Sequence, residues 1–269
     1  MAGQSVDAEQ IRTILTEAAR VNGVDVEAIN KLPNEKAALR SVRLPKVAMV
    51  LGQGFNAYNN GEVWYMLDRR FGLTPARIDF NRLHKIKSLD NYNVMTIISG
   101  TTKEPISPES FNVIRNWVEQ GGTLIVVGNG LANIRAAKLA NIKQIAAPTG
   151  GGDADKNFGI IVNTTLDPTS PIGYGYDQTE VPVFKRNNIA LDREQNKFDY
   201  IPMSYTESPL LSGCISQANL SRYSNTPSAV VIKHGQGRVI YFVDNFNFRS
   251  YWFATMKIFM NSLYFGNFY

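Results

Sequence analysis

Cysteine and histidine are scarce in this chain of 269 residues, which holds one cysteine, Cys214, and two histidines, His84 and His234. A single cysteine excludes an internal disulfide and a cluster of thiolate metal ligands. The histidines lie far apart and belong to no His-x-x-Glu or His-Glu-x-x-His motif. A zinc site would need mostly carboxylate ligands, which is uncommon. We therefore predict no metal site and no cofactor in this chain.

Long apolar runs and clustered charges are also lacking. No run approaches the ~20 apolar residues that span a bilayer, and the first residues show no signal-peptide pattern. The 28 Lys and Arg exceed the 23 Asp and Glu only modestly and are spread along the chain. Phosphate tracking needs clustered positive charge. We expect a soluble globular protein with neither a nucleic-acid partner nor a membrane partner.

The N-terminal residues predict a helix followed by a linker. Asp7 can cap a helix with Gln10 three positions on, and apolar residues recur at helical spacing from Ile11. Asn22-Gly23 gives a stop signal. The polar stretch "KLPNEKAALRSVRLPK" carries two prolines and is typical of a linker. We predict a helix and linker over residues 1–41 and one domain over residues 42–269.

Strand and helix patterns alternate in the first half of that domain. Helical periodicity appears in "NNGEVWYMLDRRFG", with Val63, Leu67 and Phe71 on one face, and in "SPESFNVIRNWVEQGG". Strands and helices in alternation imply right-handed βαβ crossovers and a parallel sheet covered on both faces. The predicted fold is α/β, flavodoxin-like and doubly wound, with a mainly parallel sheet. The predicted strands are "KVAMVLG", "PARIDF", "NYNVMTIISG" and "TLIVVG".

The second half of the domain is less regular. Residues 147–188 are rich in turn residues and tyrosine, which predicts loops over the sheet edge or the crevice mouth. Two apolar runs around "GQG" then predict an antiparallel hairpin near the C-terminus. The last helix carries Trp252, Met256 and Phe259 at core spacing.

Ligands of such sheets bind in the crevice beyond the carboxyl ends of the strands. The loops at residues 52–58, 99–105 and 128–133 should surround this mouth, and polar residues cluster again between the hairpin and the last helix. The candidate crevice or binding residues are Gln53, Tyr58, Glu62, Thr101, Asn129, Asn245 and Arg249.

The turn "GNGLAN" resembles a nucleophile elbow, a strained strand-to-helix turn that exposes a reactive side chain. Asn129 has no nucleophilic atom, and Gly130 has no side chain. His84 and His234 are interpreted as ordinary surface or turn residues. Cys214 follows a Ser-Gly turn and is interpreted as a small buried or half-buried residue. We predict no catalytic residue in this chain.

Three features of the crevice region leave alternatives open. Glu62 is either a first-turn helix acid or a polar group that points into the crevice. Tyr174, Tyr176 and Phe184 either form an aromatic ligand surface or pin their loop to the domain. Arg249 either contacts a ligand or holds the last loop by bonding to carbonyl groups.

The segments "GEVWYMLDRRFG", "IRNWVEQGGTLIVVG", "ESPLLSGCISQANL" and "GQGRVIYFVDNFNFRSYWFATMKIFMNSLYFG" carry a resemblance that covers about residues 42 to 269. They resemble the C-terminal domain of bacterial zinc carboxypeptidases of the carboxypeptidase A type, which is similar to the class I glutamine amidotransferase fold. The resemblance implies a periplasmic or secreted parent whose upstream peptidase domain holds the zinc, its His and Glu ligands and the general-acid glutamate. This chain lacks the elbow cysteine and the His-Glu partners of an amidotransferase.

These observations lead us to expect a catalytically silent, amidotransferase-like module that docks on a peptidase domain or presents substrate to it. Two other functions stay open. One is a hydrolase that uses Glu62 with Asn129 or Asn245 in an unfamiliar arrangement. The other is a stand-alone carbohydrate- or peptide-binding protein that uses the aromatic loop.

Overall fold

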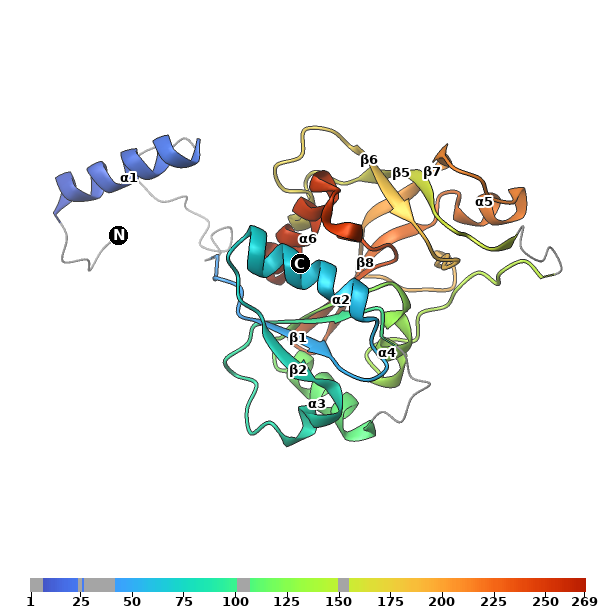
Figure 1. Cartoon of the computed structure of the whole chain (residues 1–269), viewed down its shortest axis with the longest axis horizontal. Helices are drawn as coiled ribbons and strands as arrows, with labels where there is room; N and C mark the ends of the chain where they lie inside the picture. The colour runs from blue at the N-terminus through green and yellow to red at the C-terminus, as the bar shows by residue number, and fades with distance from the viewer. Residues whose placement is uncertain (1–6, 24–25, 27–41, 101–106, 150–154) are drawn as a thin grey trace. The chain divides into compact units, whose positions relative to one another are not determined.

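The computed structural model describes residues 7–23, 26, 42–100, 107–149 and 155–269 (Figure 1). The chain divides into two compact units, Met1–Ser41 and Val42–Tyr269. This division falls where the sequence analysis places the boundary between the linker and the domain.

The first unit contains helix α1 (Ala8–Asn22). Asp7 caps it as predicted, because its carboxylate accepts hydrogen bonds from the backbone N–H groups of Glu9 at 2.7 Å and Gln10 at 3.1 Å. Gly23 ends the helix in the left-handed conformation, with φ 62°, which glycine adopts at little cost. The local signals at both ends of this helix were sufficient to predict its bounds.

In the described residues, the second unit is built on one mixed sheet of nine strands in the order β2-β1-β3-β4-β9-β8-β7-β5-β6. The parallel half comprises β1 (Val47–Leu51), β2 (Ala76–Asp79), β3 (Val94–Ile98), β4 (Thr123–Val127) and β9 (Gly237–Phe242). The antiparallel half comprises β5 (Ile160–Leu166), β6 (Glu180–Lys185), β7 (Tyr200–Ser212) and β8 (Pro227–His234).

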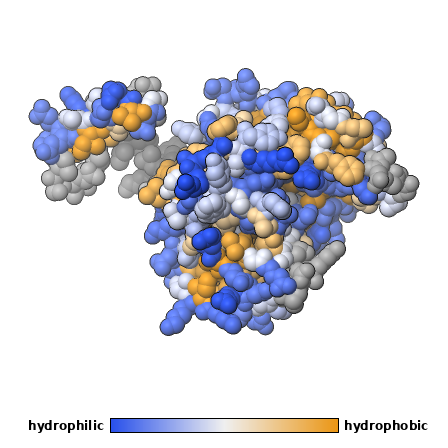
Figure 2. All heavy atoms as spheres, viewed as in Figure 1, coloured by the Kyte–Doolittle hydropathy of each residue, from blue (hydrophilic) through white to orange (hydrophobic). Residues whose placement is uncertain are grey.

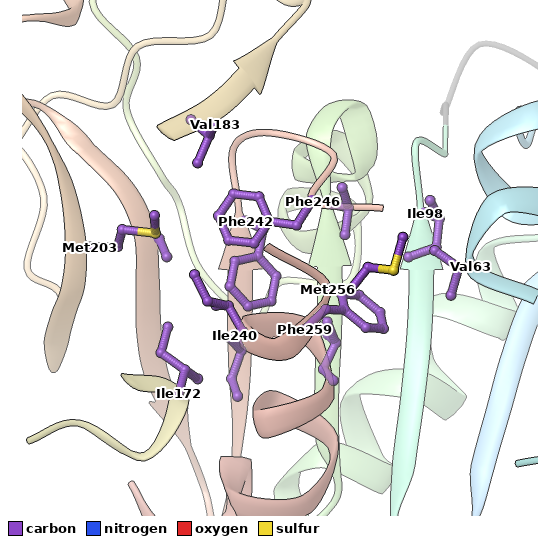
Figure 3. Packing of buried hydrophobic residues seen from close by; sticks show 14 of the residues in the cluster. Val63, Ile98, Ile172, Val183, Met203, Ile240, Phe242, Phe246, Met256 and Phe259 are labelled. Atoms are coloured by element: carbon purple, nitrogen blue, oxygen red, sulfur yellow. The ribbon is translucent and has the colours of Figure 1, made fainter. Parts of the chain in front are cut away.

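Helices cover both faces of the parallel half, as a doubly wound fold requires. Side chains of α2 and α6 belong to one buried cluster, in which Phe242 of β9 and Phe259 of α6 lie 6.1 Å apart (Figure 3). Side chains of α3 and α4 belong to a second cluster. The predicted α/β fold is therefore confirmed. The helices are α2 (Ala57–Trp64), α3 (Pro108–Glu119), α4 (Leu131–Ala136), α5 (Gln217–Tyr223) and α6 (Phe253–Phe265).

The central parallel strands β3 and β4 are buried at every residue. Strands buried on both faces appear as continuous apolar runs, and this pattern explains why they were visible in the sequence. The predicted hairpin is also confirmed: β8 and β9 pair antiparallel, with His234 opposite Gly237 at the turn. On the face of this unit that Figure 2 shows, hydrophobic residues lie among hydrophilic ones, as in most folded domains.

The structure corrects two expectations about local structure. Residues 147–188, expected to form loops, contain strands β5 and β6, which pair antiparallel. Their side chains alternate between buried and less buried positions, a period of two that the abundant turn residues obscured. The helix after β1 continues as a π-helical turn over Tyr65–Arg70. This change of period leaves Phe71 48% exposed instead of in the core.

Candidate functional site

A crevice of about 550 Å³ opens beyond the carboxyl ends of the parallel strands. Ser99 follows β3, Gly128 follows β4 and Asn245 lies just beyond β9, as expected for a ligand crevice in this type of sheet. The residues that line it are Asn56, Tyr58, Asn59, Glu62, Ser99, Gly128, Asn129, Phe184, Arg186, Asn187, Asn245, Phe248 and Arg249.

Five of the seven predicted crevice residues line this cavity: Tyr58, Glu62, Asn129, Asn245 and Arg249. Of these, Tyr58 is 85% exposed to solvent. Gln53 is exposed and does not line the cavity. Thr101 lies outside the described residues.

The strand-to-helix turn after β4 has the backbone geometry of a nucleophile elbow, but the strained position is Gly128 rather than Asn129. Gly128 directly follows β4 with φ 59°, and α4 begins at Leu131. A Cβ at this position would lie 3.2 Å from the Ser99 Oγ atom, at the floor of the crevice. The residue that would carry a nucleophile in an elbow is therefore a glycine here.

The nearest hydroxyl to that position is that of Ser99, which begins the loop predicted at residues 99–105 but was not named as a candidate site residue. Ser99 has φ 47°, a strained conformation for a residue with a side chain. Its Oγ atom accepts a hydrogen bond from the Asn59 side-chain N–H at 2.7 Å. An amide donor cannot remove the serine proton, and no histidine lines the cavity among the described residues. The arrangement holds Ser99 in place without activating it.

Glu62 lies in the second half of α2, not in the first turn as one interpretation held. The alternative, a carboxylate facing the crevice, describes its position. Its Oε2 atom accepts a hydrogen bond from the Asn245 side-chain N–H at 2.6 Å. Burial raises the pKa of Glu62, and this effect exceeds the opposing contributions of the Arg249 backbone N–H, Asn245 and the charges of Arg249 and Arg186.

The loop after β9 is tied to α2 through Glu62. Arg249 and Ser250 have φ values of 49° and 54°, which are costly for residues with side chains. The Arg249 backbone N–H hydrogen-bonds to Glu62, and the Ser250 hydroxyl donates to the Glu62 backbone oxygen at 3.2 Å. These contacts support the strained turn and aim the Arg249 side chain at the crevice.

The antiparallel half supplies one wall of the crevice, through residues at the end of β6 and just after it. Phe184 stacks on Phe248 with ring centroids 4.3 Å apart. The guanidinium groups of Arg249 and Arg186 lie 5.3 Å and 6.0 Å from the Phe248 centroid. This part of the crevice lining thus combines two positive charges with a pair of stacked aromatic rings. Phe184, one of the aromatic residues that the sequence analysis considered as a ligand surface, does line the crevice, whereas Arg186 and Asn187 were missed because β6 was taken for a loop.

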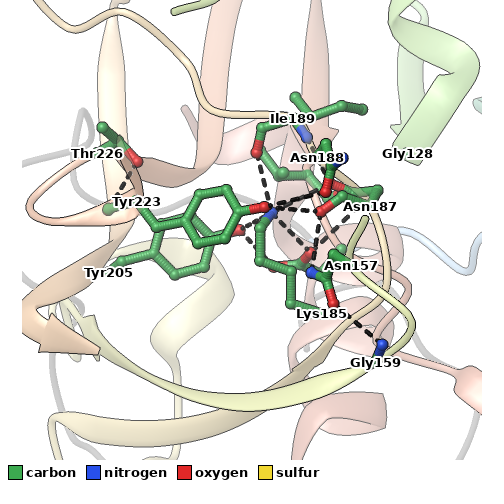
Figure 4. Close-up of polar contacts among 12 residues, drawn as sticks. Gly128, Asn157, Gly159, Lys185, Asn187, Asn188, Ile189, Tyr205, Tyr223 and Thr226 are labelled. Atoms are coloured by element: carbon green, nitrogen blue, oxygen red, sulfur yellow. Dashed lines mark hydrogen bonds and ion pairs between the residues drawn. The ribbon is translucent and has the colours of Figure 1, made fainter. Parts of the chain in front are cut away.

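A buried ion pair lies beside this wall, and Figure 4 shows its lysine, Lys185, among the residues Ile189 and Tyr205. Lys185 and Asp244 are fully buried, with Nζ and Oδ1 3.4 Å apart. Lys185 also donates to the Ile189 carbonyl at 2.9 Å and to the Tyr205 hydroxyl at 3.0 Å. Tyr205 in turn donates to the Asp244 Oδ2 atom at 2.5 Å. The pair fixes the start of the loop that carries Asn245 and Arg249.

Burial shifts the pKa values of Lys185 and Tyr205. Burial lowers the pKa of Lys185, and the charge of Asp244 opposes that shift. Burial and the Asp244 charge raise the pKa of Tyr205 well above its ordinary value. Tyr205 therefore stays protonated and can donate to Asp244 at neutral pH.

Other predicted residues lie elsewhere. His84 contacts Ser107, with Nδ1 and Oγ 3.2 Å apart, and His234 pairs with Glu119 at 3.2 Å. Cys214 is exposed, which corrects the expectation of a buried or half-buried thiol. Tyr174 and Tyr176 contact α6, through the Phe265 ring and the Ala254 carbonyl, so their loop is pinned to the domain.

Two further features are absent from the described residues. No group of three or more His, Cys, Asp or Glu side chains is placed to hold a metal ion in the described ranges. None of the helices described is both long enough and apolar enough to cross a bilayer.

No protein-family model and no curated protein matches this sequence. Similarity appears in solved structures. PurLQS from Thermotoga maritima matches with a TM-score of 0.55 and 12% identity, over 81% of this chain and 97% of that one. The chain has a class I glutamine amidotransferase-like fold.

Two other solved structures are similar to this chain over most of its length. A ThuA-like protein from Bacteroides uniformis matches with a TM-score of 0.52 and 12% identity, over 83% of this chain and 92% of that one. A GMP synthase-like protein from Thermoplasma acidophilum matches with a TM-score of 0.51 and 11% identity, over 82% of this chain and 94% of that one. At these identities the similarity supports the amidotransferase-like fold and says nothing of activity.

Proposed function

We propose that this chain is a non-catalytic, amidotransferase-like domain that uses its crevice to bind a ligand. The observation that carries the proposal is the glycine at the strained elbow position, Gly128. A backbone turn of this kind without a nucleophilic side chain keeps a shaped pocket but supplies no atom to attack a substrate. Cys214 does not line the crevice, so it does not replace the missing nucleophile.

We further propose that the domain serves a zinc-dependent carboxypeptidase of periplasmic or secreted location, by docking on its peptidase domain or presenting substrate to it. The sequence resemblance described above supports this role. In this arrangement the upstream domain carries out proteolysis and holds the zinc, while this chain contributes neither metal nor cofactor. A reading frame upstream of Met1 that codes for paired His and Glu zinc ligands would support the role, and an unrelated upstream frame would contradict it.

Glutaminase and peptidase assays on the purified chain test the non-catalytic function. We expect no turnover of glutamine or of peptide substrates. Turnover that disappears in Cys214→Ala or Glu62→Gln would reject the proposal. Cys214 lies outside the crevice and Glu62 within it, so the two variants also distinguish where any activity arises.

A hydrolase that uses Glu62 is the second candidate. The observation in its favour is the raised pKa of this carboxyl in the crevice, since shifted carboxyl groups occur at catalytic sites. This candidate predicts a pH–rate profile that follows Glu62. A profile unchanged in Glu62→Gln would exclude it.

A further inference from the structure

We propose that the crevice binds a sugar acid, with the carboxylate held by Arg186 and Arg249 and the hydroxyl groups held by asparagine side chains. This proposal names a ligand class for the crevice and rests on the binding function proposed above. Its support comes from the charges, the hydrogen-bonding groups and the aromatic wall of the cavity.

The charges favour an anionic group. Arg186 and Arg249 are exposed at the crevice, and neither forms an ion pair within 4.0 Å among the described residues. Glu62 is the acidic residue among those that line the cavity, and it already accepts from Asn245 and from the Arg249 backbone. Two guanidinium groups beside one ring thus face the crevice. Their charges lower the pKa of Glu62, but no carboxylate lies within 4.0 Å of either group in the described structure. The planar guanidinium fork matches a carboxylate in two-point contact.

The hydrogen-bonding groups favour a ligand with many hydroxyls. Five asparagines line the cavity: Asn56, Asn59, Asn129, Asn187 and Asn245. Each amide carries an acceptor oxygen and two N–H donors, which suits hydroxyl groups that both donate and accept. In the described structure the Asn56 N–H₂ group, the Asn59 side-chain oxygen and the whole Asn129 amide make no hydrogen bond. These groups remain available to a ligand.

The aromatic wall and the size fit a sugar ring better than a peptide. The stacked, half-buried Phe184 and Phe248 offer an apolar face to the C–H groups of a pyranose ring. A cavity of about 550 Å³ lies in the range of small-ligand sites. A peptide would need an edge strand for its backbone or apolar subsites for its side chains. This crevice is bounded by strand ends and polar amides instead.

Calorimetric titration of the full chain tests the proposal with D-glucuronate as the probe. D-glucose shares the hydroxylated ring but lacks the carboxylate, and acetate has a carboxylate without the ring. We expect glucuronate to bind at least ~10-fold more tightly than either, because charge-assisted hydrogen bonds and hydroxyl contacts both contribute. Equal binding of glucose and glucuronate, or no binding of glucuronate, would overturn the proposal.

Matched variants locate the site. Arg186→Gln and Arg249→Gln should each weaken glucuronate binding by ~10-fold, and Asn129→Ala should weaken glucuronate while leaving the folded state unchanged. Arg82→Gln removes an equal charge at a position outside the crevice and should have no effect. Circular dichroism melting checks that each variant folds. Equal effects of Arg82→Gln and Arg249→Gln would overturn the assigned site.

A last set of calorimetric titrations uses peptides with a free or an amidated C-terminus. If a free C-terminus binds and glucuronate does not, the ligand class is wrong while the binding function stands. Turnover in the glutaminase or peptidase assay would instead reject the proposed function itself. The two failures are therefore distinguishable.

Discussion

The two halves of the sheet differ in how their sequence encodes them and in what they bring to the crevice. In the parallel half, β3 and β4 are buried at every residue, and their ends position Ser99 and Gly128. In the antiparallel half, β5 and β6 alternate between buried and less buried residues, and the end of β6 brings Arg186 to the same cavity. The parallel half thus positions Ser99 and Gly128, and the loop after its strand β9 carries Arg249, while the antiparallel half adds the second positive charge, Arg186.

The buried pair of Lys185, on β6, and Asp244, just after β9, links the two halves, and its disruption should have the largest effect on the free energy of unfolding. Asp244→Ala leaves Lys185 buried without its partner, and we expect a loss of about 3 to 5 kcal/mol in the free energy of unfolding. Urea denaturation followed by circular dichroism measures it. As a control, Arg115→Gln breaks the more exposed pair with Glu119, whose atoms lie 3.8 Å apart, and should cost at most about 1 kcal/mol.

A double variant sharpens this test. Lys185→Met with Asp244→Leu removes both charges and should be more stable than Asp244→Ala, because no uncompensated charge stays buried. If the single and double variants lose equal stability, the loss in Asp244→Ala does not come from an uncompensated charge on Lys185.

Substitutions in the turn between β4 and α4 should have the next largest effect on the free energy of unfolding. A Cβ at Gly130 would lie 2.6 Å from the Val126 Cγ1 atom and 3.2 Å from the Ile97 backbone oxygen. We expect Gly130→Ala to cost about 1 to 3 kcal/mol through overpacking. Gly128→Ala has its closest contact with the Ser99 Oγ atom at 3.2 Å and should cost about 1 to 2 kcal/mol for its left-handed backbone. Denaturant midpoints measure both, and a clearly larger loss in Gly128→Ala would contradict the packing described here.

The aromatic loop of the antiparallel half should contribute stability and not ligand binding. Tyr174 is 66% exposed and packs edge-on against Phe265, with centroids 5.2 Å apart. Tyr174→Ala should lower the free energy of unfolding by about 0.5 to 1.5 kcal/mol and leave the glucuronate affinity unchanged. A loss of affinity in this variant would return the aromatic loop to consideration as the binding surface.

The subtlest effect concerns pH and Glu62. Because burial raises the pKa of Glu62 above 4.5 in the folded chain, the folded state binds this proton more tightly than the unfolded state. The contribution of Glu62 to the free energy of unfolding is therefore greatest below its pKa in the unfolded chain. It falls as the pH rises through its pKa in the folded chain. Glu62→Gln lacks this titration, so the stability of the wild type relative to the variant should decrease with rising pH. Urea denaturation from about pH 4 to about pH 8 measures the difference, and a constant difference would show that burial does not control this carboxyl.

Local signals allowed much of the fold and five of the thirteen residues that line the crevice to be predicted. The apolar runs identified the parallel strands, and the strand-end rule then placed Tyr58, Asn129 and Asn245 at the crevice. Glu62 was located but assigned to the wrong end of its helix, because Asn56 caps α2 earlier than the sequence analysis assumed. The strand-end rule also placed the loop that begins at Ser99, but it did not single out Ser99, whose left-handed backbone angle is not visible in the sequence.

The sequence by itself determined the capped N-terminal helix, the parallel strands, the hairpin and the absence of a nucleophile at the turn after β4. These features depend on periodicity, end signals and residue identity, which act over short stretches of chain. Only the tertiary structure decided that β6 borders the crevice and that Lys185 and Asp244, 59 positions apart, form a buried pair. Such contacts depend on the pairing of distant strands, which no local pattern specifies.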